Sequence, residues 1–196
     1  MIKHALVALT LYAGLVSVAI ASERLTPQTL EAAAALRAGE MRKLVIHAEP
    51  KAPVDVTFLT VDGAEQDLHA SAGKIRIVNF WATWCAPCKI EKPKLDALNQ
   101  ALGGAEFEVV AIATGRNSPK GIKRFNEDLG ITSLTTYLDP RNQAAASFGV
   151  IGLPVSVVID REGREIGRLT GAGDWNSAEA QAIFRTLIAG SQAVSN

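Results

Sequence analysis

The chain has 196 residues, of which 48% are apolar and 20% are charged, values typical of one globular domain with an extension. Its twenty basic residues balance its twenty acidic ones, so the chain lacks the positive field of a nucleic-acid-binding protein. The sequence also contains no dense run of Lys and Arg that could bind an anionic membrane surface.

Residues 1–21 have the layout of a secretory signal peptide. Lys3 and His4 precede an apolar stretch over residues 5–20, and small residues stand just before Ser22. An uncleaved membrane anchor is the alternative, because the stretch is only slightly shorter than the roughly 20 residues that span a bilayer. In either case we expect the remaining chain to lie outside the cytoplasm, in a periplasm-like compartment.

The residues that follow are expected to form an N-terminal helical extension over 22–50. Thr26 and Pro27 are typical of a helix start and Gly39 of a helix end, which predicts a helix over 27–38. Residues 51–190 are expected to form the main domain and 191–196 a tail.

The main domain is expected to open with a β-hairpin, because a strand pattern over 54–61 ends at the turn signal Asp62-Gly63. A strand over 75–80, a helix over 86–102 and a strand over 107–113 then predict a right-handed parallel βαβ unit. The later elements comprise an inserted helix-strand element, a brief helix and a ββα unit. They are placed at 118–129 and 134–138, then up to 148, then at 155–159, 165–169 and around 180–188. This order predicts an α/β fold with a central sheet flanked by helices.

Cys85 and Cys88, the only two cysteines, stand in C-x-x-C spacing where the predicted strand meets the predicted helix. A disulfide that closes so short a loop stabilises a fold by roughly 2 kcal/mol, so chemistry explains the pair better than stability. Helix N-terminal amides favour a thiolate, which makes Cys85 the expected nucleophile. Cys88 is expected to resolve the mixed disulfide, and Pro87 to keep the first helical turn rigid.

Other chemistries of a C-x-x-C pair fit less well. Covalent haem attachment needs a His directly after the second cysteine, and that residue is Lys89. A structural zinc site needs four ligands, but His4, His47 and His69 all lie upstream and no second cysteine pair exists. Cu(I) suits thiolates, yet no His or Cys follows the pair to supply a third ligand. We therefore expect a redox-active dithiol with no metal and no dissociable cofactor.

The segment Asn79–Cys88, which ends in Trp-Cys-Ala-Pro-Cys, resembles the thioredoxin superfamily and is most similar to its exported TlpA/ResA-type thiol:disulfide oxidoreductases. The similarity covers residues 51–190, in which Pro93 matches the helix proline of the superfamily. Gly152-Leu153-Pro154 matches the loop whose proline is cis and faces the disulfide. The resemblance implies a thioredoxin-like fold with a mixed sheet, and it places Leu153 and Pro154 in a substrate groove.

The sequence departs from thioredoxins proper at the proton acceptor. Asn79 stands where they carry a buried Asp, and the apolar run 110–112 replaces the partnering Lys. Glu91 falls on the inward stripe of the helix with Cys88, so we expect a desolvated carboxyl with a raised pKa that exchanges a proton with Cys88. ResA-type proteins carry an acid at this offset, whereas a solvated helix Glu is the alternative. Trp84, next to the nucleophile, is expected to shape the surface around it.

The resemblance implies a reductase that acts on protein disulfides, such as cysteine pairs of apocytochromes c or copper-site assembly proteins. A membrane electron donor would then recharge it. The dipeptide Ala86-Pro87 resembles that of the reducing types. A disulfide oxidant or isomerase, or a copper metallochaperone that uses the cysteine pair, remain the alternatives at the level of sequence.

Overall fold

The computed structural model describes residues 24–190. The predicted signal peptide or anchor over 1–21 and the predicted tail over 191–196 lie outside the described residues. Within residues 24–190, no helix is both long and apolar enough to span a membrane.

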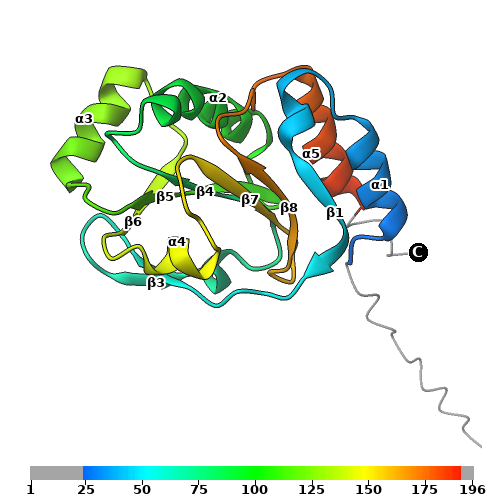
Figure 1. The fold of residues 1–196 in the computed structure, drawn as a ribbon, viewed down its shortest axis with the longest axis horizontal. Coiled ribbons are helices and arrows are strands. Elements are labelled where there is room, and N and C mark those ends of the chain that lie inside the picture. The colour runs from blue at the N-terminus through cyan, green and yellow to red at the C-terminus, as the bar shows by residue number, and fades with distance from the viewer. Residues whose placement is uncertain (1–23, 191–196) are drawn as a thin grey trace, which may run out of the picture.

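One mixed sheet forms the centre of the molecule (Figure 1). The strands run in the order β1-β8-β7-β4-β5-β6-β2-β3, and the neighbours β4–β5 and β5–β6 are parallel, while the other pairs are antiparallel. Among the described residues, the strands are β1 Val45–Lys51, β2 Thr57–Leu59, β3 Glu65–Asp67, β4 Ile75–Trp81, β5 Phe107–Thr114, β6 Thr135–Asp139, β7 Val155–Ile159 and β8 Glu165–Thr170.

Helices cover both faces of the sheet. In Figure 1, α2 and α3 lie above the sheet and α4 lies below it, while α1 and α5 pack side by side at the β1 end. The helices of the described chain are α1 Pro27–Ala35, α2 Ala86–Leu102, α3 Pro119–Leu129, α4 Gln143–Ser147 and α5 Ala178–Gly190, with 3₁₀ turns η1 Gly39–Lys43 and η2 Leu68–Ser71.

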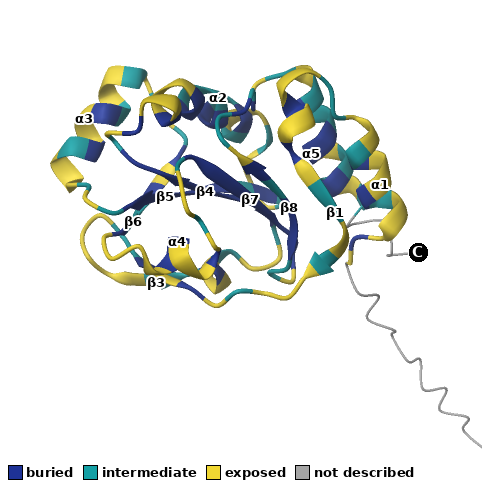
Figure 2. Cartoon of the chain, viewed as in Figure 1, coloured by how far each residue is buried: buried dark blue, intermediate teal, exposed yellow. Residues whose placement is uncertain are grey.

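Strand β4 lies at the centre of the sheet and every one of its residues is buried (Figure 2). Successive side chains of a strand point to opposite faces. Ile75 and Ile77 accordingly join the cluster formed with α1, α2 and α5, whereas Val78 and Phe80 join the cluster formed with α4. Asn79 therefore points to the α2 face of the sheet.

The predicted α/β class, with a central mixed sheet, flanking helices and an N-terminal β-hairpin, is confirmed. Helix α2 and strand β7 have the predicted bounds. Helix α3 ends at Gly130, which adopts the left-handed conformation that favours glycine. The hairpin of β2 and β3 pairs Thr57 with Asp67.

The purely helical extension predicted over 22–50 is wrong in its second half. Helix α1 is present but ends at Ala35, and Val45–Lys51 form strand β1, which pairs antiparallel with β8 at the edge of the sheet. All seven residues of β1 are exposed or half-buried, so the strand lacks the alternation of apolar and polar residues that identifies a strand in a sequence.

Candidate active site

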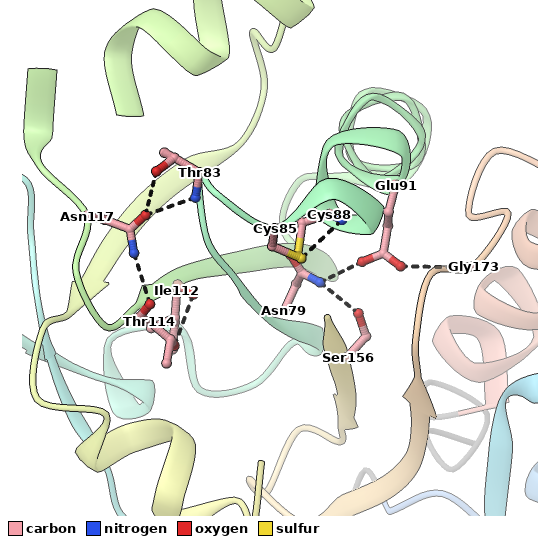
Figure 3. Close-up of a disulfide and its surroundings, with 10 residues drawn as sticks. All are labelled: Asn79, Thr83, Cys85, Cys88, Glu91, Ile112, Thr114, Asn117, Ser156 and Gly173. Atoms are coloured by element: carbon pink, nitrogen blue, oxygen red, sulfur yellow. Dashed lines mark hydrogen bonds between the residues drawn. A yellow bond between two sulfur atoms is a disulfide. The ribbon is translucent and has the colours of Figure 1, made fainter. Parts of the chain in front are cut away.

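The cysteine pair lies where the loop after β4 leads into α2. Cys85 is the N-cap residue of α2, and Cys85 and Cys88 form a disulfide with a Cα–Cα distance of 5.2 Å. The backbone N–H of Cys88 donates a hydrogen bond to Cys85 Sγ at 3.3 Å (Figure 3). Cys85 is 6% exposed and Cys88 1%. A negative charge on Cys85 would thus lie at the positive end of α2 with an amide donor already in contact.

Two prolines shape the helix that carries the pair. Pro87 occupies the first turn of α2, where a residue without an N–H costs little. Pro93 lies inside the helix, and α2 nevertheless continues to Leu102 with its apolar stripe facing the sheet. The inward stripe that the sequence predicts therefore persists beyond the proline, with Leu95 and Leu98 fully buried.

Glu91 lies on that inward stripe and is 1% exposed. Its carboxylate accepts hydrogen bonds of 2.8 Å from Asn79 Nδ2 and from the backbone N–H of Gly173 (Figure 3). Burial raises the pKa of the Glu91 carboxyl above its ordinary value, although these hydrogen bonds, the adjacent Trp175 indole and the Lys92 ammonium favour the charged form. A solvated helix glutamate, the alternative left open by the sequence, does not describe this side chain.

Asn79 connects β4, β7 and α2 beneath the disulfide. Its Nδ2 group donates to Glu91 and also to Ser156 Oγ at 3.0 Å, and its Oδ1 atom is buried without a hydrogen-bond partner. The residue opposite Asn79 on β5 is Ala111, so neither strand supplies a titratable side chain at this level. Glu91 is thus a carboxyl group in direct hydrogen-bond contact with the position at which thioredoxins proper carry their proton acceptor.

Three residues at this site were missed by the sequence analysis: Lys92, Gly173 and Trp175. Lys92 is 1% exposed, and its Nζ atom lies 4.1 Å from the centroid of the Trp81 ring. Its position four residues after Cys88 could have identified it, because that spacing returns to the same helix face. Gly173 and Trp175 carry no local signal, since they reach Glu91 from the segment after β8.

The loop before Cys85 is held by Asn117, which follows β5. Asn117 Oδ1 accepts hydrogen bonds from the backbone N–H of Thr83 at 2.9 Å and from its hydroxyl at 3.0 Å, and Asn117 Nδ2 donates to the Thr114 carbonyl (Figure 3). The segment between β4 and α2 is thereby tied to the end of β5, and Cys85 is presented from a fixed loop.

The surface around Trp84, next to Cys85, is hollowed and carries both apolar and polar side chains. Trp84 is 65% exposed and Ile151 is fully exposed. The peptide bond between Leu153 and Pro154 is cis, and Leu153 packs against the buried cluster that contains both cysteines. A groove of about 790 Å³ runs from Trp84 to Leu153 and is also lined by Arg116, Asn142 and Val150, among others. Trp81, in contrast, is fully buried.

No group of three or more His, Cys, Asp or Glu side chains within residues 24–190 is arranged to hold a metal ion. The cysteine pair therefore has no third ligand from these residue types among its described neighbours. This arrangement gives the copper alternative no support beyond the two sulfur atoms.

Comparisons with known proteins connect this site to a family. The Redoxin family model matches residues 47–183. The thiol:disulfide interchange protein HelX of Rhodobacter capsulatus is 35% identical over 105 residues, which cover 54% of this chain and 57% of HelX. The thiol-disulfide oxidoreductase ResA of Geobacillus thermodenitrificans is 31% identical over 118 residues, 60% of this chain and 66% of ResA. The chain thus spans less than two thirds of the length of these curated relatives.

Solved structures share the fold over most of the domain. A thiol:disulfide interchange protein of the thioredoxin family from Chlorobium tepidum is 28% identical with a TM-score of 0.59, covering 72% of this chain and 99% of that one. A secreted thiol-disulfide isomerase from Corynebacterium glutamicum is 20% identical with a TM-score of 0.63, covering 76% and 92%. The predicted thioredoxin-like fold is confirmed.

Proposed function

The chain belongs to the Redoxin family, and from that premise we propose that it is an extracytoplasmic thiol:disulfide reductase of the TlpA/ResA type that acts on protein disulfides. One observation carries the proposal: Cys85 caps the N-terminus of α2 and already accepts the N–H of Cys88, its partner in the disulfide. This geometry stabilises a thiolate on Cys85, and thiolates are the attacking species in disulfide exchange.

The proposed reaction is dithiol–disulfide exchange. The thiolate of reduced Cys85 attacks one sulfur of a substrate disulfide, and the other substrate sulfur leaves as a thiolate. Cys88 then attacks Cys85 in the mixed disulfide, which releases the second substrate thiol and restores the Cys85–Cys88 disulfide. The two electrons pass from the enzyme dithiol to the substrate, and no dissociable cofactor takes part.

Glu91 is proposed as the proton acceptor for Cys88. Cys88 must lose its proton before it attacks, and it is too buried for bulk water to accept that proton directly. The Glu91 carboxyl lies one helical turn further along the same face, and burial raises its pKa toward that of a thiol. Asn79 and Gly173 hold its two oxygens in place.

The groove beside Cys85 is the proposed binding site of the substrate chain. Its lining by Trp84, Ile151 and Leu153 suits an extended peptide segment that flanks a disulfide, while Pro154, which follows Leu153, is buried. Cysteine pairs of apocytochromes c or of copper-site assembly proteins are the substrates we propose, with a membrane electron donor that restores the dithiol. The Ala86-Pro87 dipeptide supports the reducing direction.

Trapping tests this proposal. Cys88→Ser leaves the mixed disulfide unresolved, so exported proteins are expected to accumulate covalently on Cys85, whereas Cys85→Ser is the matched control that captures none.

The reduction potential tests the direction: a value above about −150 mV, toward that of a strong oxidant, would contradict a reductase. Tight stoichiometric Cu(I) binding without disulfide turnover would instead favour the metallochaperone.

A further inference from the structure

Lys92 is a buried amine without a hydrogen-bond partner. It lies on α2, is 1% exposed, and its Nζ atom makes no hydrogen bond within the described chain. The contact that the structure gives this amine is with the face of the Trp81 ring, 4.1 Å from the ring centroid. Burying an ammonium group away from water without an ion pair destabilises a fold, so packing alone does not explain a lysine at this position.

The amine shares its surroundings with the cysteine pair. Lys92 lies four residues after Cys88 on the same face of α2, and helical side chains lean toward the helix N-terminus. Trp81, which Lys92 covers, belongs to the buried apolar cluster that contains Cys85 and Cys88. The amine therefore contacts the same buried cluster as the sulfur atoms, and electrostatic interactions are stronger inside a protein than in water.

Few charged side chains interact with the Lys92 amine. Glu91 and Asp96, both on α2, favour its ammonium form, yet burial outweighs them and lowers the pKa of Lys92 to about 7. The Asp96 carboxylate accepts hydrogen bonds from the backbone N–H groups of residues 132–134. From β4 the neighbouring side chain is the aromatic Trp81, which in turn packs against Phe125 of α3.

The charged side chains that α3 contributes lie in solvent instead of facing the amine. They form exposed i,i+4 ion pairs, Lys123–Glu127 and Arg124–Asp128. Such pairs are screened by water and are worth little energetically. The groups that govern the proton of Lys92 are therefore Glu91, Asp96 and any charge on the cysteines.

We propose that Lys92 is a positioning residue for the proposed disulfide exchange, whose amine takes up a proton when the Cys85–Cys88 disulfide is reduced and so supplies a counter-charge for the Cys85 thiolate. The inference rests on the proposed function for its biological meaning.

The step balances with a dithiol as reductant. Two electrons from the dithiol break the S–S bond while the dithiol becomes a disulfide. Of its two protons, one goes to Cys88 as a thiol and the other to the Lys92 amine, and Cys85 remains a thiolate. When the enzyme reduces a substrate, both protons leave again with the substrate thiols.

NMR titration of the lysine side chains tests the proposal directly. In the full-length protein labelled at lysine, the Lys92 signal is expected to titrate near neutral pH in the oxidised state. After reduction with dithiothreitol it should titrate at least about one pH unit higher, because a thiolate nearby favours the ammonium. Identical titration of Lys92 in the two redox states would overturn the proposal.

A variant pair supplies the second test. Lys92→Met removes the charge and keeps an unbranched apolar side chain, and alkylation of Cys85 at neutral pH is expected to slow about three- to tenfold, as for a thiol pKa raised by up to one unit. Lys89→Met is the matched control, because Lys89 is adjacent to Cys88 but exposed to solvent; it should change the rate less than about twofold. Equal slowing by both variants, or by neither, would count against Lys92.

Failure of this proposal is distinguishable from failure of the proposed function. Dithiothreitol reduces the pair chemically, so the titration of Lys92 is measured whether or not a protein substrate is turned over. Trapping of substrates by Cys88→Ser, together with an unshifted Lys92 titration in the wild type, overturns the role of Lys92 alone. A shifted Lys92 in a protein that traps no substrate overturns the reductase and leaves the redox-linked proton in place.

Discussion

Glu91 combines a buried carboxyl with two fixed hydrogen-bond donors one helical turn from the resolving cysteine. As a base it must be ionised, and because burial raises its pKa, the ionised form is lost at a higher pH than for an ordinary glutamate. The rate at which Cys88 resolves a mixed disulfide should therefore fall on the acid side as Glu91 becomes protonated.

Glu91→Gln tests this role. Glutamine keeps the shape and accepts the hydrogen bond from Asn79 but cannot take a proton, so we expect resolution to slow by at least about tenfold and the acid limb of the pH profile to disappear. Stopped-flow measurement of the thiol released from a model mixed disulfide, between about pH 5 and pH 9, reports both effects. Glu31→Gln, an exposed residue of α1, is the control, and unchanged rates in Glu91→Gln would remove Glu91 from the mechanism.

Among single residues, the sequence predicts those that their chemistry and the helical periodicity identify. Cys85, Cys88 and Glu91 fall at defined offsets on one helix, so their common face follows from 3.6 residues per turn. The partners of Glu91 do not follow, because Gly173 contacts it from 82 residues away and Ser156 contacts Asn79 from 77 residues away. Lys92 escaped notice because a lysine is usually a solvated helix residue.

Among the elements, β1 is joined to the sheet by side chains as well as by its backbone. Buried Glu165 of β8 accepts hydrogen bonds from His47 at 2.9 Å and Lys51 at 3.1 Å, both on β1, and from Arg168 on its own strand. Burial alone would raise the pKa of Glu165, but these donors outweigh it and lower the pKa from 4.5 to about 2. The ionised carboxylate therefore stabilises the attachment of β1.

Glu165→Gln is expected to lower the free energy of unfolding by about 1–3 kcal/mol at neutral pH, because the hydrogen-bond donors around Glu165 lose their charged acceptor. The stabilisation by Glu165 is complete above its unfolded pKa of 4.5 and is lost as the pH falls toward its folded pKa of about 2. The difference between variant and wild type should therefore shrink over that range in urea titrations.

Glu40→Gln provides the control for this element, since the Glu40–Lys43 pair is exposed and is expected to contribute less than about 1 kcal/mol at any pH. A Glu165→Gln penalty that stays constant down to pH 2 would contradict the assignment of the low pKa to Glu165. These contacts also explain why β1 forms a strand although its sequence does not predict one. The strand is held at the sheet edge by pairing with β8 and by polar side-chain contacts, so its sequence shows no alternation of apolar and polar residues.

The whole molecule is organised around β4, and the sequence predicts the central strands of the sheet more clearly than its edge strands. The fully buried strands β4 and β7 appear as short, mainly apolar runs, and glycine and proline mark the helix ends, so the alternation of elements is predictable from local pattern. The order of strands in the sheet is not encoded locally, and the resemblance of the Trp84–Cys88 motif and the Leu153-Pro154 loop implied only that the sheet is mixed. The attachment of α1 to α5 depends on long-range packing that no local pattern specifies.

Lys92 links the stability of this core to pH. Its pKa is about 7 in the folded protein and 10.5 ordinarily, so the unfolded chain binds this proton more tightly. The resulting loss of stability begins as the pH falls below 10.5 and is complete below about 7. A core residue with this behaviour weakens the oxidised protein most at neutral and acidic pH.

Lys92→Met should therefore stabilise the oxidised protein, by about 1–4 kcal/mol at neutral pH, because an apolar side chain replaces a buried charge over the Trp81 ring. The gain over wild type is expected to grow as the pH falls from about 10 to about 7 and then to level off. Urea unfolding across this range measures it, with Lys89→Met expected to stay within about 0.5 kcal/mol of wild type throughout. A gain that does not vary with pH would mean that the pKa of Lys92 is the same in the folded and unfolded protein, so that the amine is already an ammonium in the oxidised fold. The redox-linked proton would then have to reside on another group.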